Sequence, residues 1–251
     1  MSRRRIGTSP PPRRAGSPRR RRRSGETAPV EAALRPPRLP AQRPGQEGGA
    51  RDANRRARLR QLGEAALELF LAEGIPGVTI DQIVERAGVA KGSFYRYFRD
   101  KEELVASLLE PLAQKVAETF TSSRAALAGA RDAAQVSAAY LDLARQVADV
   151  IAAHPRAALL YLQEARGPGA GARAPVRRLA DQVADLAESL SAHARDRGLL
   201  RDLDARVQGL VVLGAVERLL YDFLSGRRVA ARPEQVSALV VTIILDGVRR
   251  R

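Results

Sequence analysis

Apolar residues recur at intervals of three and four positions along most of the chain beyond residue 50, and this spacing predicts amphipathic helices. No stretch alternates apolar and polar residues as a half-buried strand would, and no segment repeats along the chain. The segments with helical spacing are 52–73, 79–87, 90–98, a longer one that begins after Asp100, 136–151, 157–165, 176–198, 203–224 and 236–248. The pattern therefore predicts an all-α fold.

Two of these helices, 79–87 and 90–98, are short and almost adjacent. Thr79 is followed three residues later by Gln82, which is the arrangement of a capping box at a helix start. Gly88 supplies the residue type that most readily takes the left-handed conformation in which a helix ends. The segment is thus predicted to be two helices joined by a tight turn.

The second short helix has an inner and an outer side. Phe94 and Phe98 are four positions apart, so both rings share one face, and we expect them in the core. The other side chains are donors and flat rings, which suit phosphates and base edges. They are Lys91, Ser93, Tyr95, Arg96 and Tyr97. The pattern favours a helix-turn-helix whose second helix enters the major groove of DNA, and an ordinary helical hairpin with a polar outer face is the alternative.

Residues 74–108 resemble the DNA-binding segment of the TetR family of bacterial transcriptional regulators. The match has no gap, and GVAKGSFYRYFRDKEEL is close to the most specific run of that family. Beyond this segment the likeness lies in helix order and length. The resemblance implies a three-helix DNA-binding domain at 51–103, a helical ligand-binding and dimerisation domain at 104–251, and a separate basic tail at 1–50.

The family's DNA contacts carry over onto matching positions of this chain. By resemblance, Thr79 offers its hydroxyl and backbone N–H to a phosphate, Gly92 permits close backbone approach, and Lys101 clamps a phosphate at the start of the next helix. Lys91 and Arg96 reach base edges or phosphate, and the two tyrosines contact phosphate through their phenols. The complete predicted set is Thr79, Lys91, Gly92, Ser93, Tyr95, Arg96, Tyr97 and Lys101.

Residues 1–50 carry thirteen arginines against three glutamates, a balance of +10 within a net charge of +15. Nine of the fifteen prolines lie there with few large apolar residues, so this tail is expected to be disordered. It has two interpretations: a non-specific DNA tether acting through counterion release, or a dispensable extension upstream of the true start codon. No apolar run of signal-peptide length follows the arginines, so neither export nor membrane anchoring is expected.

Five arginines crowd the start of the helix at 52–73, where cations are poorly placed for the helix dipole. They are Arg51, Arg55, Arg56, Arg58 and Arg60. In the family that this chain resembles, the region lies near the DNA backbone, which makes phosphate contact one hypothesis. A solvated basic face is the other.

Pro111 lies within the helix that begins after Asp100. Proline removes one backbone hydrogen bond and clashes with the preceding turn, so we expect a bend between Ser107 and Pro111. Because the family joins its two domains through this helix, the bend is a candidate hinge. A fixed kink without a signalling role is the alternative.

The last two helices are apolar on more than one side, which indicates a second partner surface. The resemblance implies a homodimer held by these helices, with two recognition helices one DNA turn apart. The predicted interface residues are Val211, Leu213, Leu220, Val236, Leu239, Val240, Ile243 and Ile244. The apolar run at 238–245 is too short to span a bilayer, which takes about 20 residues.

The resemblance also implies a small molecule bound inside the second domain. Because the helices are rich in Ala, Leu and Val, an apolar effector is favoured, and its identity is not written in the sequence. The candidate contacts are the aromatic and polar residues Phe120, Tyr140, His154, Tyr161 and Gln163. Each is also compatible with an ordinary place in the core or on the surface.

The function implied by the resemblance is a ligand-responsive, sequence-specific transcriptional regulator. It would be a repressor that binds a near-palindromic operator in double-stranded DNA and is released by its effector. A non-specific architectural DNA-binding protein, driven by the basic tail, is the alternative. The absence of cysteine fits the reducing cytoplasm. No HExxH, P-loop or Gly-rich dinucleotide turn is present, so we expect no catalytic residue, metal or cofactor.

Overall fold

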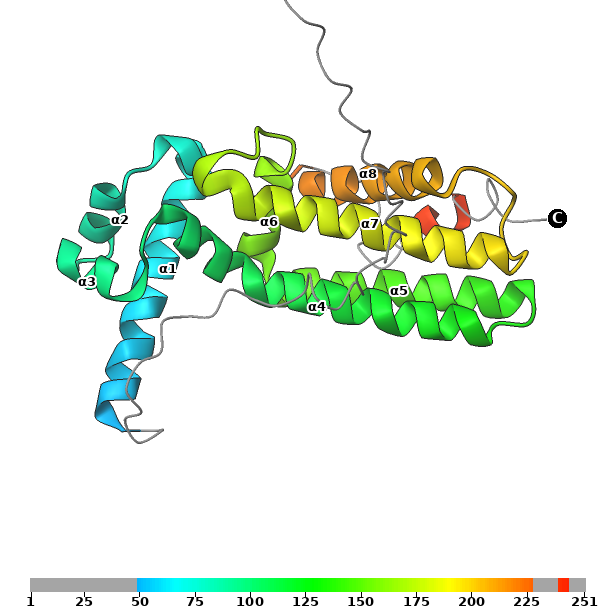
Figure 1. Cartoon of the computed structure of the whole chain (residues 1–251), viewed down its shortest axis with the longest axis horizontal. Helices are drawn as coiled ribbons and strands as arrows, with labels where there is room; N and C mark the ends of the chain where they lie inside the picture. The colour runs from blue at the N-terminus through cyan, green and yellow to red at the C-terminus, as the bar shows by residue number, and fades with distance from the viewer. Residues whose placement is uncertain (1–48, 228–238, 244–251) are drawn as a thin grey trace, which may run out of the picture. The chain divides into compact units, whose positions relative to one another are not determined.

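The structure, a computed structural model, describes residues 49–227 and 239–243. Within these ranges it contains helices and no strand, which confirms the predicted all-α class (Figure 1). The predicted interface residues Val236 and Ile244, and residues 1–48 of the predicted tail, lie outside the described residues. The elements are α1 (Ala50–Gly77), α2 (Ile80–Arg86), α3 (Lys91–Tyr97), α4 (Lys101–Gly129), α5 (Ala133–Ala153), α6 (Pro155–Glu164), a 3-10 turn η2 (Gly171–Arg173), α7 (Ala174–Asp196) and α8 (Ala205–Leu224).

The local signals around α2 act as the sequence predicts. Thr79 accepts the backbone N–H of Gln82 at 3.2 Å, and the Gln82 side chain accepts the backbone N–H of Thr79 at 2.7 Å, which completes the capping box. Gly88 ends the helix with φ at +63°. The helical path of α1 breaks at Gly74, whose φ of +77° is in the left-handed region that suits glycine.

The core beneath α2 and α3 is continuous with the core of the later helices. Phe94 and Phe98 are buried as predicted, with ring centroids 5.6 Å apart. They belong to a cluster that includes Leu104 of α4, Leu160 of α6 and Val176 of α7. The predicted domain boundary at 103/104 falls inside α4, so the two predicted domains share one helix and one core.

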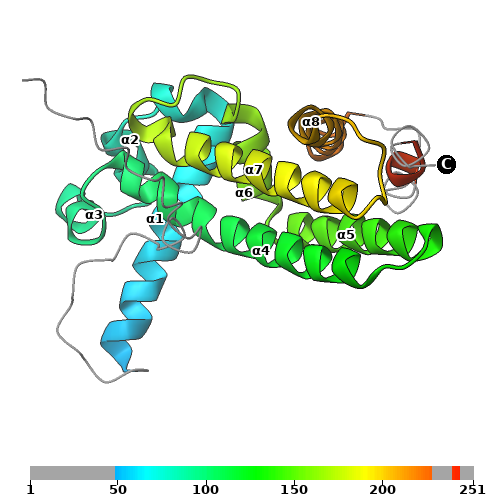
Figure 2. The same cartoon turned by 45° about the vertical axis from the view of Figure 1, so that its right-hand side comes forward.

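Helices α4, α5, α7 and α8 lie side by side beyond this junction (Figures 1 and 2). Pro111 does not end α4, which continues to Gly129, and the proposed hinge role of this proline stays a prediction. A second apolar cluster, which includes Leu127, Val136 and Leu190, lies between α4, α5 and α7.

Helix α8 packs very closely on α7 through Gly209. A Cβ atom built on Gly209 would lie 2.9 Å from the backbone nitrogen of Glu188, so only glycine fits there. The outer side of α8 leaves Val207, Leu210 and Val211 exposed. Among the described helices, none is both long and apolar enough to cross a membrane.

Candidate nucleic-acid interface

Helix α3 presents most of the predicted contact residues to solvent. Lys91, Gly92, Tyr95 and Arg96 are exposed, and Ser93 is half-buried. Among the described helices, α2 and α3 lie at one end, away from α5 and α8 (Figures 1 and 2). The surface that the helix-turn-helix hypothesis requires is therefore open.

The ring of Tyr95 is held in place by the core residue Phe94. Its side chain is 53% exposed, and its ring packs edge-on against the fully buried Phe94 at a centroid distance of 5.4 Å. An aromatic ring packed in this way loses little further freedom when its hydroxyl binds a partner. Tyr97 differs, because it is half-buried and packs against the main core cluster.

Among the described residues, no packing contact requires glycine at position 92. A Cβ atom at this position would meet no atom within 4 Å, and its φ is not in the left-handed region. Glycine favours a helix less than alanine does, by up to about 1 kcal/mol in a helix interior. A partner molecule that approaches the backbone of α3 closely would explain why glycine occupies this position.

In the protein without nucleic acid, Lys91 forms an ion pair with Asp81. Its ammonium lies 2.6 Å from a carboxylate oxygen of Asp81 on α2, and both side chains are exposed. The hydrogen bond to Asp81 raises the pKa of Lys91 above its usual value, so the lysine stays charged. Because Asp81 competes for this cation, its carboxylate should oppose binding of a phosphate at this place.

Replacing Asp81 with Asn should strengthen DNA binding, because it frees Lys91 and removes a negative charge from the surface. Exposed ion pairs are weak, so affinity should rise only roughly 1.5-fold to 5-fold. The slope of log affinity against log salt should also become steeper. Fluorescence anisotropy over a salt series measures both effects, with Asp149→Asn on α5 as the control. Weaker binding by the Asp81 variant would show that the pair positions Lys91 for its contact.

Lys101 occupies a structural position that sequence reasoning missed. Its ammonium donates to the backbone carbonyl of Ile75 at 2.7 Å and to that of Val78, across the connection between α1 and α2. Partial burial lowers the pKa of Lys101. Two of its three donors are used inside the protein, and its contact with phosphate stays a prediction. The contact joins residues 26 apart, and no local pattern indicates it.

The hydroxyl and the backbone N–H of Thr79 also form hydrogen bonds within the protein. Its hydroxyl accepts the backbone N–H of Gln82 and donates to the Gln82 side-chain oxygen at 2.8 Å, while its backbone N–H donates to that same oxygen. A phosphate at this helix start would replace the glutamine side chain as acceptor. The predicted phosphate contact of Thr79 therefore requires Gln82 to move.

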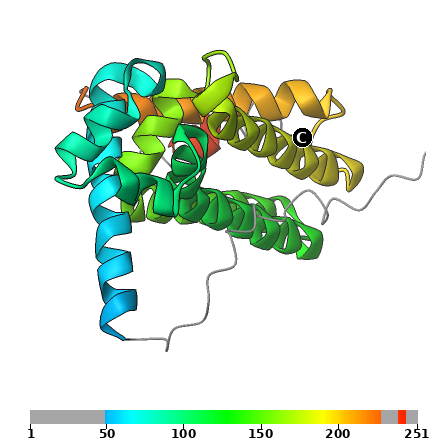
Figure 3. The same ribbon diagram turned by 60° about the vertical axis from the view of Figure 1, so that its left-hand side comes forward.

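The basic start of α1 extends away from the other helices (Figures 1 and 3). Arg51, Arg56, Arg58 and Arg60 are exposed. Arg56 pairs with Asp52 at 3.0 Å, which offsets part of the local positive charge. Phosphate contact by these arginines and a solvated basic face both stay open.

The five candidate effector contacts are spread over the second domain. Phe120 and Tyr140 pack against the second apolar cluster, where burial raises the pKa of Tyr140 to about 12. Tyr161 belongs to the main core cluster. His154 lies between α5 and α6, and Gln163 is exposed against α1, where it donates to the carbonyl of Leu71.

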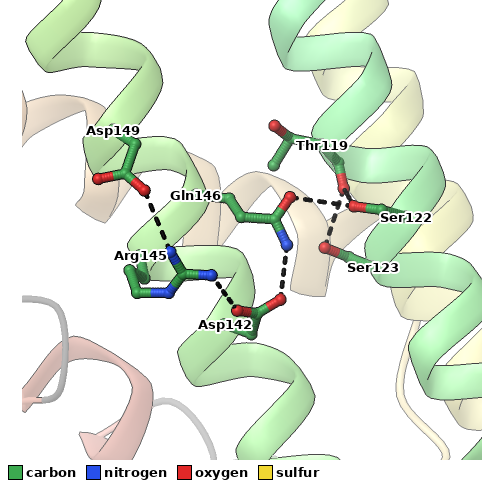
Figure 4. A network of polar contacts seen from close by, with 7 residues as sticks. All are labelled: Thr119, Ser122, Ser123, Asp142, Arg145, Gln146 and Asp149. Atoms are coloured by element: carbon green, nitrogen blue, oxygen red, sulfur yellow. Dashed lines mark hydrogen bonds and ion pairs between the residues drawn. The ribbon is translucent and has the colours of Figure 1, made fainter.

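A polar hollow of about 360 Å³ lies between α4 and α5. Its lining includes Thr119 and Ser122 of α4 and Gln146 and Asp149 of α5. The Ser122 hydroxyl donates to the Gln146 side-chain oxygen at 3.0 Å, and Arg145 bridges two aspartates on α5 (Figure 4). These groups satisfy one another, and none of the five candidate effector contacts lines the hollow.

The helix-turn-helix is similar in sequence to known proteins. Residues 62–108 match the family model described as bacterial regulatory proteins, tetR family. An uncharacterized HTH-type transcriptional regulator of Pseudomonas putida, TtgW, is 46% identical over 46 residues. The matched part is 18% of this chain and 34% of TtgW, so the sequence likeness spans about a third of that relative.

Solved structures extend the likeness in fold over most of the chain. The fatty acid degradation regulator FadR from Bacillus halodurans matches with a TM-score of 0.58 and 19% identity, covering 84% of this chain and all of that one. FadR from Bacillus subtilis, solved in complex with stearoyl-CoA, matches with a TM-score of 0.56 and 17% identity over 75% of this chain and 98% of its own. The sequence match therefore identifies residues 62–108 as a helix-turn-helix segment of the TetR type, and the solved structures show that the described helices share the fold of these regulators.

Proposed function

We propose that this chain is a sequence-specific transcriptional regulator that represses its target by inserting α3 into the major groove. The observation that carries the proposal is the exposed face of α3, with a lysine, a supported tyrosine and an arginine beside a glycine that internal packing does not require. Such donors match the acceptors of guanine and of phosphate. Repression rather than activation follows from family resemblance.

The regulator acts as a homodimer in this proposal, with α8 and the helical segment 239–243 at the interface. Val207 and Val211 are 60% and 66% exposed, and Leu239 and Ile243 are also exposed. Exposed apolar side chains on α8 and on the segment 239–243 favour a second copy of the chain as their partner. The half-buried members of the predicted interface are Leu213, Leu220 and Val240. A twofold dimer would place two α3 helices about 34–36 Å apart on a near-palindromic operator.

A small-molecule effector with an apolar portion releases the operator in this proposal. FadR from Bacillus subtilis, which shares the fold, holds stearoyl-CoA. Long-chain acyl-CoA is therefore the first class to add to operator complexes, with free coenzyme A as the control. The effector acts by favouring a spacing of the two α3 helices that fits DNA poorly.

Genomic binding-site selection tests the proposal. The full chain and a chain that begins at residue 51 should both enrich the same near-palindromic sequence, because the basic tail adds affinity without sequence preference. The enriched site would also locate the regulated gene. Binding that survives scrambling of the DNA and disappears with the tail would instead support a non-specific architectural protein, the interpretation that the +10 balance of residues 1–50 favours.

A further inference from the structure

A buried carboxylate of α6 bonds to the backbone of the helix-turn-helix domain. Glu164 is 4% exposed, and its Oε1 accepts the backbone N–H of Ile75 at 3.1 Å. Its Oε2 accepts from the guanidinium of Arg173 in η2. A Cβ atom on Gly74 would lie 3.0 Å from Oε1, so glycine and the carboxylate fit each other closely.

One turn earlier on the same helix, a tyrosine bonds to α8. The hydroxyl of Tyr161 donates to Oε1 of Glu217 at 2.6 Å, and the Tyr161 side chain is buried. The second oxygen of Glu217 lies 3.4 Å from the guanidinium of Arg166. Burial and the neighbouring carboxylate raise the pKa of Tyr161, so it remains a donor at any physiological pH.

The peptide segment that Glu164 contacts is held from its other side by α4. Lys101 donates to the carbonyls of Ile75 and Val78, which precede the start of α2. Only a few residues separate this segment from the capped start of α2, and α2 packs on α3. A displacement of the segment would therefore displace α3, because little free chain lies between them.

The geometry points to Tyr161 and Glu164 as positioning residues that set the orientation of α3 relative to α8. This inference rests on the proposed dimer, in which α8 meets its twofold copy. Beside the shared core and the continuous α4, a single turn of α6 would then link each α3 to the dimer axis, with Glu217 at one end and Ile75 at the other. The two contacts thereby determine which spacing between operator half-sites the dimer accepts.

Two conservative variants remove the bond to Glu217 or weaken the bond to Ile75 while keeping the shape of the side chains. Tyr161→Phe deletes only the hydroxyl and leaves Glu217 with Arg166 as its partner. Glu164→Gln keeps an oxygen for the N–H of Ile75 and removes the charge that pairs with Arg173. Burial of both positions means that stability must be measured beside DNA binding.

The test uses the full chain and a set of DNA duplexes whose two half-sites, taken from the selected operator, differ only in spacing. A duplex with one half-site is included. Each variant should lose about 5-fold or more in affinity at the preferred spacing, the lower end of common coupling strengths, and much less at neighbouring spacings. Binding to the single half-site should stay within about twofold, since α3 itself is unchanged. Glu118→Gln, the same carboxylate-to-amide change on α4, should keep the native spacing profile.

Three results would overturn the inference. A spacing profile identical to that of the native chain would show that the contacts do not position α3. An equal loss on every duplex, including the single half-site, would show that they support only the folded state, and urea denaturation would reveal the matching loss of stability. A native chain that prefers no spacing at all would contradict the proposed dimer and this inference together.

Discussion

Replacing Gly209 with Ala should destabilise the protein by about 1–3 kcal/mol, the usual cost of forcing extra volume into a packed contact. The added Cβ would lie 2.9 Å from the backbone nitrogen of Glu188 and 3.0 Å from the carbonyl carbon of Ala187. These are backbone atoms, so no side chain can rotate away, and α7 and α8 must separate. The midpoint of urea denaturation measures the effect.

Gly129 provides the control for this change. It is the last residue of α4, and a Cβ there meets no atom within 4 Å, so Gly129→Ala adds the same methyl group without a clash. Its stability should be unchanged or slightly raised. If the Gly209 variant is as stable as the Gly129 variant, α7 and α8 move apart without a loss of folding stability.

Replacing Gly92 with Ala should change stability and DNA binding in opposite directions. Alanine favours a helix over glycine, by at most about 1 kcal/mol in a helix interior, and no described atom packed against α3 lies within 4 Å of the added methyl group. If DNA approaches the backbone of α3 as proposed, the same methyl group intrudes on the complex. A clash of about 1–3 kcal/mol corresponds to a loss of roughly 5-fold to 150-fold in operator affinity.

Urea denaturation and fluorescence anisotropy on the selected operator measure the two effects of the Gly92 change. The Gly129→Ala variant again serves as the control, since it lies far along α4 from the helix-turn-helix and should bind the operator normally. Undiminished affinity in the Gly92 variant would exclude close backbone approach at this residue. The exposed face of α3 would then need another mode of contact.

Local rules were sufficient for the elements around α2 and α3. The capping box at Thr79, the left-handed turn at Gly88 and the inward pair Phe94 and Phe98 each depend on residues within four positions of one another. Such short-range relations can be recognised in a single sequence. The predicted outer face of α3 followed from the same spacing.

Contacts between distant parts of the chain were not predictable in this way. Lys101 was expected on the DNA side, yet its ammonium bonds carbonyls 23 and 26 residues earlier in the chain. The bond between Glu164 and Ile75 spans 89 residues, and Tyr161 reaches Glu217 across 56. Charged residues on amphipathic helices usually face solvent, so no pattern marks the few that do not.

The effector contacts were the least predictable part. Residue type alone selected Phe120, Tyr140, His154, Tyr161 and Gln163, and the structure distributes them among two core clusters, a helix junction and the surface. A pocket is defined by the packing of several helices, and one sequence does not specify that packing. For the same reason, the sequence did not predict the polar hollow between α4 and α5.

The shared core has a consequence for engineering hybrid regulators from this chain. Leu104, Leu160 and Val176 pack in the same cluster as Phe94, and α4 crosses the nominal border without a break. A graft that exchanges only the first hundred residues would pair a foreign apolar face with α6 and α7. Transplanting a new operator preference should therefore succeed more often by rewriting the outward positions of α3 than by swapping the whole module.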